Sequence, residues 1–134
     1  MNDWKAIFGS YVNDGVYLAA PGAKLAGIKK TAKAAGYEVI SINLNRAKTS
    51  KDFLTAVARG LKFPAYFGEN WDALNDSLMD MSWYPARGYA IILTGYGAFR
   101  GKMGAEDLPI EHIFESAAAY WQQKAVPFFI IVLD

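Results

Sequence analysis

Four short segments rich in β-prone apolar residues, separated by segments with helical periodicity, constrain the fold of this chain most strongly. They span residues 16–20, 37–44, 89–94 and 128–133. The last run is continuously apolar, which is typical of a strand whose two faces are both covered. Strands that alternate with helices in this way favour a parallel sheet. We therefore predict an α/β fold, in which a small, mainly parallel β-sheet of three to four strands is packed by helices on both faces.

The segments between these runs carry the helix signals. We expect helices over residues 24–35, 50–61, 70 to about 82, and 109–124. Thr49 or Ser50 can cap the second of these helices, and Asn70 can cap the third. The first fifteen residues lack periodicity, so we expect a loose arm or loop there. Residues 95–104 are rich in glycine, and we predict an irregular connector.

The composition is that of one globular domain over residues 1–134. Hydrophobic residues make up 53% of the chain and charged residues 20%, which is too apolar for a disordered chain. No cysteine occurs, which excludes disulfides, thiol catalysis and zinc–thiolate sites. The sequence lacks a signal-like start, and no run approaches the roughly 18 apolar residues of a membrane span. We therefore expect a soluble, cytoplasmic protein.

The most unusual charge distribution lies between Pro64 and Pro85. This stretch holds four acids and no Lys or Arg, so it carries −4 in a chain of net charge +1 and leaves +5 on the rest. The acids are Glu69, Asp72, Asp76 and Asp80. Their spacing is helical, so we predict a stripe of four acids along one side of a single helix. The other side is apolar and is predicted to face the core, through Trp71, Leu74, Leu78 and Met81.

An ordinary solvated helix face accounts for only part of this stripe. The helix dipole favours acids in the first turn, which suits Glu69 and Asp72. It disfavours Asp76 and Asp80 in later turns, where like charges four residues apart also repel. Surface helices usually relieve such repulsion with a lysine, and none occurs here. The pattern therefore indicates a functional surface.

Three kinds of ligand can be compared for such a surface: a metal ion, a substrate attacked by paired carboxylates, and a basic protein. Four acids spread over about 16 Å of helix axis do not converge on one metal ion. Carboxylate catalysis needs two acids that face each other across a cleft, which neighbours on one helix face do not provide. A linear anionic stripe fits a partner groove lined with Arg and Lys.

Aromatic residues beside the acids support the interpretation as a protein interface. Tyr66 is the best surface candidate, because it precedes Gly68 in a loop shaped by Pro64. Exposed Tyr beside charges is typical of interface hot spots. The positions of Trp71 and Phe67 instead fit the core.

Other motifs carry weaker signals. His112 is the only histidine, and no catalytic partner for it can be named. The glycine-rich segment 95–104 does not match a phosphate-binding loop, because Met103 follows Lys102 where such loops have Ser or Thr. The lysines of residues 24–33 are interleaved with alanines instead of aromatics, which argues against a nucleic-acid surface.

One segment has a specific resemblance. Residues 63–78 read FPAYFGENWDALNDSL, and a Tyr-Pro pair follows at residues 84–85. This segment closely resembles the core motif of the barstar family of intracellular ribonuclease inhibitors, and the likeness runs from about residue 37 to 134. The resemblance implies a small α/β domain with no catalysis, cofactor or metal of its own. Residues 1–36 then form an N-terminal extension, which we expect to add a strand and a helix.

The resemblance also implies a partner: a basic, extracellular-type ribonuclease or a ribonuclease toxin domain, with no direct contact to nucleic acid or membrane. Asp72 and Asp76 would pair with the phosphate-binding Arg and Lys of that enzyme. Phe67 and Asn75 depart from the family pattern, which has a second tyrosine and often a tryptophan at these positions. The expected contact residues are Tyr66, Phe67, Gly68, Glu69, Asn70, Asp72, Asn75, Asp76, Met79 and Asp80.

Two alternatives remain open at this point. The first is a non-inhibitory interaction module on the same scaffold, which binds a basic partner protein that is not a nuclease. The second is an enzyme that uses Asp72 or Asp76 together with a bound metal.

Overall fold

A four-stranded sheet, parallel throughout, forms the centre of the molecule. The computed structural model describes residues 1–134. The strands are β1 (Gly15–Leu18), β2 (Glu38–Asn43), β3 (Tyr89–Thr94) and β4 (Phe128–Leu133). Their order across the sheet is β1-β4-β3-β2, and every neighbouring pair is parallel. The predicted α/β fold with a small parallel sheet is confirmed.

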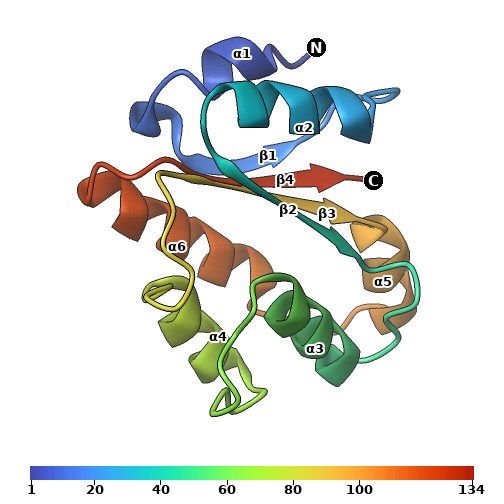
Figure 1. Ribbon diagram of the computed structural model, residues 1–134. Coiled ribbons are helices and arrows are strands. Elements are labelled where there is room, and N and C mark those ends of the chain that lie inside the picture. Colours follow the sequence, from blue (N-terminus) through green and yellow to red (C-terminus); the bar gives the residue numbers. More distant parts are fainter.

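Helices cover both faces of this sheet. Figure 1 shows α1 (Trp4–Ile7) and α2 (Leu25–Ala34) above the sheet, and α3 (Ser50–Gly60), α4 (Trp71–Leu78) and α6 (Ile110–Gln123) below it. The helix α5 (Tyr96–Met103) follows β3 directly, and a short 3₁₀ helix spans Tyr11–Asn13. None of these helices has the length and apolar character needed to cross a membrane.

The sheet separates two apolar cores. The larger core lies against α3, α4 and α6, and the smaller one lies against α1 and α2. In the smaller core the ring of Phe129 packs on Phe8 at 5.1 Å and on Tyr37 at 5.8 Å between centroids. Because β3 and β4 are central strands with a core on each side, their residues are apolar at nearly every position.

The glycine-rich segment 95–104 differs from its prediction, because most of it is the helix α5. Its Phe99 is fully buried and stacks on Phe53 at 5.2 Å between ring centroids. Gly97 donates its N–H to the carbonyl oxygen of Asp134 at 2.7 Å, and a Cβ on Gly97 would lie 3.2 Å from that oxygen. Tertiary packing therefore overrides the weak helix propensity of the segment, and glycine allows its close approach to the end of β4.

The first fifteen residues are also more ordered than predicted. Asp3 caps α1 by accepting a hydrogen bond from Ala6 N–H at 3.1 Å, and Ser10 caps the 3₁₀ turn through Val12 N–H. Phe8, directly after α1, is only 1% exposed. The burial of this one ring over the sheet orders a segment whose periodicity is too short to be recognised in the sequence.

Candidate functional site

The acidic segment begins with a well-formed helix start. Asn70 has extended backbone angles, and its side-chain Oδ1 accepts a hydrogen bond from Ala73 N–H at 2.8 Å. Its Nδ2 donates to the carbonyl oxygen of Gly68 at 3.3 Å. The predicted cap at Asn70 is therefore confirmed, and it ties the preceding loop to the first turn of α4.

One side of α4 enters the larger core. Leu74 and Leu78 are fully buried, and Trp71 is half-buried with its ring 5.9 Å from that of Phe53. Asp72 and Asp76 point to solvent from the remaining surface of the helix. The two-sided pattern predicted for this helix is therefore confirmed within α4 itself.

The four acids do not, however, share one helix. The helix ends at Leu78, whereas the prediction extended it to about residue 82. Both Asp80 N–H and Met81 N–H turn back to the carbonyl oxygen of Ser77, at 3.1 and 3.2 Å, and Met81 adopts a left-handed backbone with φ 53°. These two hydrogen bonds end the helix. Met81 lies in the turn that follows, and its side chain is buried.

The acids therefore form a row with two parts. Asp72 and Asp76 lie one turn apart on α4, while Glu69 precedes the helix and Asp80 follows it. Glu69 adopts a left-handed backbone with φ 52°, which is unfavourable by about 1 kcal/mol for a residue with a side chain. We refer to Glu69, Asp72, Asp76 and Asp80 together as the acidic row.

All members of the acidic row are exposed, and none forms a salt bridge within its own molecule. The one salt bridge in the structure joins Arg100 and Glu111 at 4.0 Å, away from this segment. Lys62, which precedes this segment in the chain, lies instead 4.8 Å over the ring of Tyr84. The hydroxyl of Tyr84 donates to the Glu38 carboxylate, and burial together with this hydrogen bond raises the pKa of Tyr84 to about 12. Because the acidic row forms no salt bridge, its negative charge is available to another molecule.

The two aromatic residues of the preceding loop have different surroundings. Tyr66 is 77% exposed, the most exposed aromatic side chain of the protein. Phe67 is half-buried against Phe63 at 4.9 Å between ring centroids, and Phe63 in turn packs on Trp83 at 5.5 Å. Phe67 therefore supports the loop from beneath, and Tyr66 is presented to solvent.

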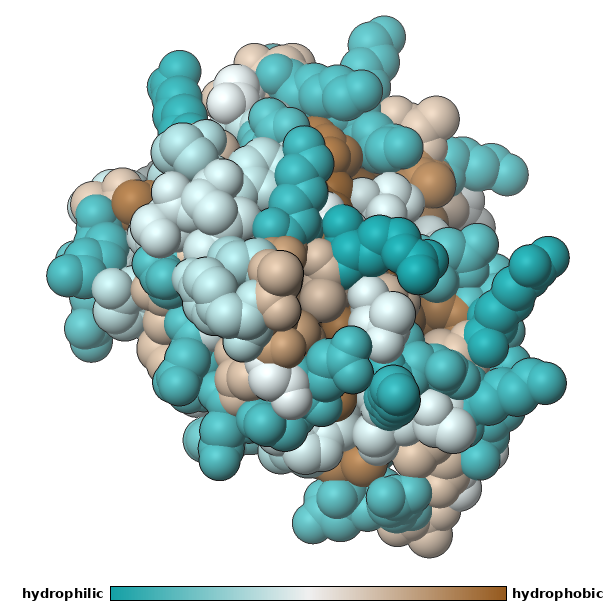
Figure 2. Space-filling model, turned by 60° about the horizontal axis from the view of Figure 1, so that its bottom comes forward, coloured by the Kyte–Doolittle hydropathy of each residue, from teal (hydrophilic) through white to brown (hydrophobic).

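The remaining predicted contact residues differ in exposure. Gly68 and Asn70 are exposed, and Asn75 and Met79 are half-buried. Figure 2 turns the underside of Figure 1 forward, where hydrophilic side chains, in teal, surround a limited group of pale and brown residues. The predicted set thus lies in one segment of the chain, from Tyr66 to Asp80, which comprises the loop, α4 and the turn after it, and which we refer to as the strip.

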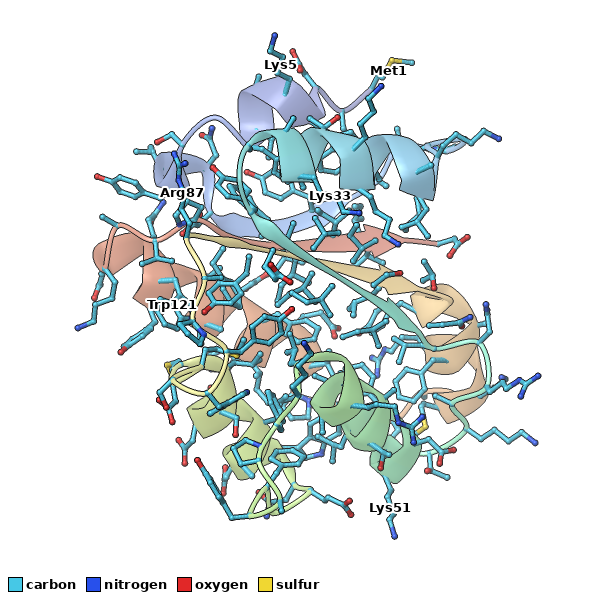
Figure 3. All side chains as sticks on the ribbon, viewed as in Figure 1. Met1, Lys5, Lys33, Lys51, Arg87 and Trp121 are labelled. Atoms are coloured by element: carbon cyan, nitrogen blue, oxygen red, sulfur yellow. The ribbon has the colours of Figure 1, made fainter.

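Two tryptophans outside the predicted contact set form hydrogen bonds beside this strip. The indole N–H of Trp121, from α6, donates to the carbonyl oxygen of Leu78 at 2.7 Å. The indole N–H of Trp83 donates to the carbonyl oxygen of Leu61 at 3.0 Å. Each bond satisfies a carbonyl at the end of a helix, which the helix itself leaves without a partner. Figure 3 shows Trp121 beside α6 on the side of the molecule where α4 lies.

Fold and surface together define a small parallel α/β domain that presents an anionic helix and an exposed tyrosine. Residues 37–133 match the family model described as Barstar (barnase inhibitor). The chain belongs to the barstar family, since this match covers β2 to β4 and the whole acidic row. The strand β1 and the helices α1 and α2 precede the matched segment.

A solved structure has a similar fold. The ORC2 protein of Aeropyrum pernix, in its ADPNP–ADP complexes, matches 98% of this chain with 14% sequence identity and a TM-score of 0.58. The match covers 40% of that protein, and at this identity it shows a shared fold alone. The comparison with curated proteins gave no match. No group of three or more His, Asp or Glu side chains in the structure is arranged to hold a metal ion.

Proposed function

We propose that this protein is a barstar-like inhibitor or immunity protein of the bacterial cytoplasm, which binds a basic ribonuclease and blocks its active site. The observation that carries the proposal is the pair Asp72 and Asp76. Both carboxylates are exposed, lie one turn apart on a capped helix, and form no salt bridge within their own molecule. Tyr66 stands exposed in the loop before them.

The physical basis is the charge of the ribonuclease site. A site that binds the RNA backbone presents Arg and Lys to phosphate oxygens, and carboxylate oxygens satisfy the same donors. Asp72 and Asp76 are about 6 Å apart along the helix axis, so two cations can be engaged at once. Inhibition then follows from occlusion, and the inhibitor needs no catalytic activity of its own.

The rigidity of the surface supports this proposal. The Asn70 cap fixes the start of α4, and the Trp121 bond fixes its end. A binding surface that is ordered before association loses less conformational entropy when the complex forms. The exposed Tyr66 adds a ring with few rotatable bonds, which is typical of interface anchors.

A second candidate function is a non-inhibitory interaction module that binds a basic partner protein. The same exposed acidic row supports it, because charge complementarity alone does not distinguish one basic protein from another. The two functions differ in one measurable respect. Only an inhibitor abolishes the activity of a ribonuclease to which it binds.

An activity titration separates them. A barnase-type ribonuclease is assayed with a fluorogenic RNA substrate while the protein is added in increasing amounts. We expect competitive inhibition, which excess substrate relieves. Asp76→Asn should weaken this inhibition. Glu106→Gln, which changes an exposed acid outside the acidic row, should leave it unchanged. Binding without inhibition would favour the interaction module. Inhibition that is equal for all three proteins would contradict the assigned surface.

A further inference from the structure

The strand β2 forms a free edge of the sheet. It pairs only with β3, as the last strand in the order. Glu38 N–H bonds to Gly88 O at 2.9 Å and Leu44 N–H to Thr94 O at 2.7 Å, so the even-numbered residues of β2 direct their main-chain groups at β3. In a parallel pair, alternate residues direct these groups to opposite sides. The N–H and C=O groups of residues 39, 41 and 43 therefore face away from the sheet.

Two hollows run along this edge and share part of their lining. One, of about 370 Å³, is bounded by residues 41–43 and by Ala56, Arg59 and Gly60 of α3. The other, of about 450 Å³, continues past Asn43 to the first turns of α3. Asn43, Ala56 and Arg59 line both. Since successive side chains of a strand point to opposite faces, a hollow lined by three consecutive residues borders the main-chain edge itself.

The groove formed by these hollows is cationic. Arg46, Lys51 and Arg59 line it, all three are exposed, and none forms a salt bridge. Figure 3 shows Lys51 projecting from α3 at the bottom of the view. The one acid in the lining, Asp52, accepts the N–H of Lys48 at 2.9 Å, and this hydrogen bond lowers the pKa of its carboxyl group. The Asp52 carboxylate is therefore hydrogen-bonded to the loop before α3, and Arg46, Lys51 and Arg59 have no carboxylate partner.

We infer that this edge binds an extended acidic segment of a partner protein, which joins the sheet as a fifth strand beside β2. Main-chain hydrogen bonds form with residues 39, 41 and 43, and carboxylates of the segment lie over Arg46, Lys51 and Arg59. Addition of a strand to an open edge is an established mode of peptide recognition. The groove uses no residue of the acidic row, so this surface is independent of the proposed ribonuclease contact.

The lining favours a peptide over a single-stranded nucleic acid. Nucleic-acid grooves of that kind combine cations with aromatic rings on which the bases stack. No aromatic residue lines either hollow. An open strand edge instead offers alternating donors and acceptors at the spacing of an extended peptide.

The test uses the full chain and a short dye-labelled synthetic peptide of alternating Glu and Val. Fluorescence anisotropy measures its binding, and hydrogen exchange reports on the amides of β2. We expect saturable binding, slower exchange at residues 39, 41 and 43, and a loss of affinity of about tenfold or more in K51E/R59E, in keeping with the removal of two partners for carboxylates. The matched control K33E changes an exposed lysine on α2, outside the groove lining, and should leave the affinity unchanged.

A second peptide separates strand pairing from simple charge attraction. It has the same sequence, but the N–H groups of every second residue are methylated and cannot bond to β2. Loss of binding by this peptide supports the added strand. Equal binding of both peptides would overturn the inference. So would self-association of the protein in sedimentation experiments together with slow hydrogen exchange of the β2 amides in the absence of peptide. Ribonuclease inhibition by K51E/R59E should equal that of the wild type, so the two proposals can fail separately.

Discussion

Trp121 and Leu78 connect the last helix of the protein to the end of its acidic helix. The indole N–H of Trp121 donates to the Leu78 carbonyl oxygen at 2.7 Å, and the same indole ring stacks on Phe128 of β4 at 6.1 Å between centroids. The end of α4 is therefore anchored through α6 to the central sheet. The position of the acidic row thus depends on a residue more than forty positions later in the chain.

Replacement of Trp121 by phenylalanine tests this anchor. Trp121→Phe keeps an aromatic ring but leaves the Leu78 carbonyl without its donor, so we expect a loss of about 1–3 kcal/mol in the free energy of unfolding. Urea denaturation measures it. Tyr120→Phe, which changes the neighbouring ring and leaves the Trp121 hydrogen bond intact, serves as the control. Equal stability of Trp121→Phe and wild type would show that the bond contributes nothing to the anchor.

The cap at Asn70 gives a second prediction. Asn70→Ala removes the acceptor of Ala73 N–H, and loss of such a cap destabilises a protein by about 1 kcal/mol. Asn70→Asp retains an acceptor oxygen at the same position, so its stability should stay close to that of the wild type. Thermal unfolding of the three proteins distinguishes the loss of the cap from a general effect of substitution at this position.

Tyr66 and Phe67 should respond to mutation in opposite ways. Phe67→Ala removes packing against Phe63, and we expect a loss of about 2 kcal/mol in stability, below the range for fully buried rings because Phe67 is half-buried. Tyr66→Ala should leave stability within about 0.5 kcal/mol, because the side chain is 77% exposed, while weakening ribonuclease binding. Comparable destabilisation by both changes would contradict the assigned roles.

Asp14 predicts a dependence of stability on pH. Its Oδ1 accepts the Phe128 N–H at 2.7 Å, while its Oδ2 is buried without a partner. Burial raises the pKa of Asp14 to about 7, although the Phe128 hydrogen bond opposes this shift. The folded state therefore binds a proton more tightly than the unfolded state, in which the pKa is near the model-compound value of 3.8. Stability from this group is fully present below about pH 4 and is lost as the pH rises to about 7.

Asp14→Asn removes this titration and keeps an oxygen for the Phe128 N–H. We expect the variant to be more stable than the wild type at pH 8 and to show a flatter profile of unfolding free energy between about pH 4 and pH 7. Denaturant melts across this range check the sign. A wild-type profile that rises relative to Asp14→Asn with increasing pH would contradict the account.

The sheet could be predicted from the sequence because its central strands are buried on both faces. In β3 and β4 nearly every position is apolar, which is a strong local signal. The cap at Asn70 and the buried face through Leu74 and Leu78 could be predicted for the same reason: each is a local pattern within one helical turn or two.

Features set by distant contacts could not be predicted in this way. The helix α5 depends on the burial of its own Phe99 in the larger core and on the close approach of Gly97 to Asp134. The end of α4 at Leu78 involves Trp121 from another helix. The prediction from the helical spacing of the acids alone therefore made this helix too long, and it wrongly placed Glu69 and Asp80 on the helix.

The central claim is that Asp72 and Asp76 occupy the place of RNA phosphates in a cationic site. The most direct measurement is the dissociation constant for a barnase-type ribonuclease, at about 50 mM and about 200 mM salt, for the wild type and for D72N/D76N. We predict that the double variant loses at least about 2 kcal/mol of binding free energy, the range of interface hot spots, for which the barstar–barnase pair is itself a reference case. We also predict a shallower dependence on salt. The same affinity and the same salt dependence in both proteins would contradict the account.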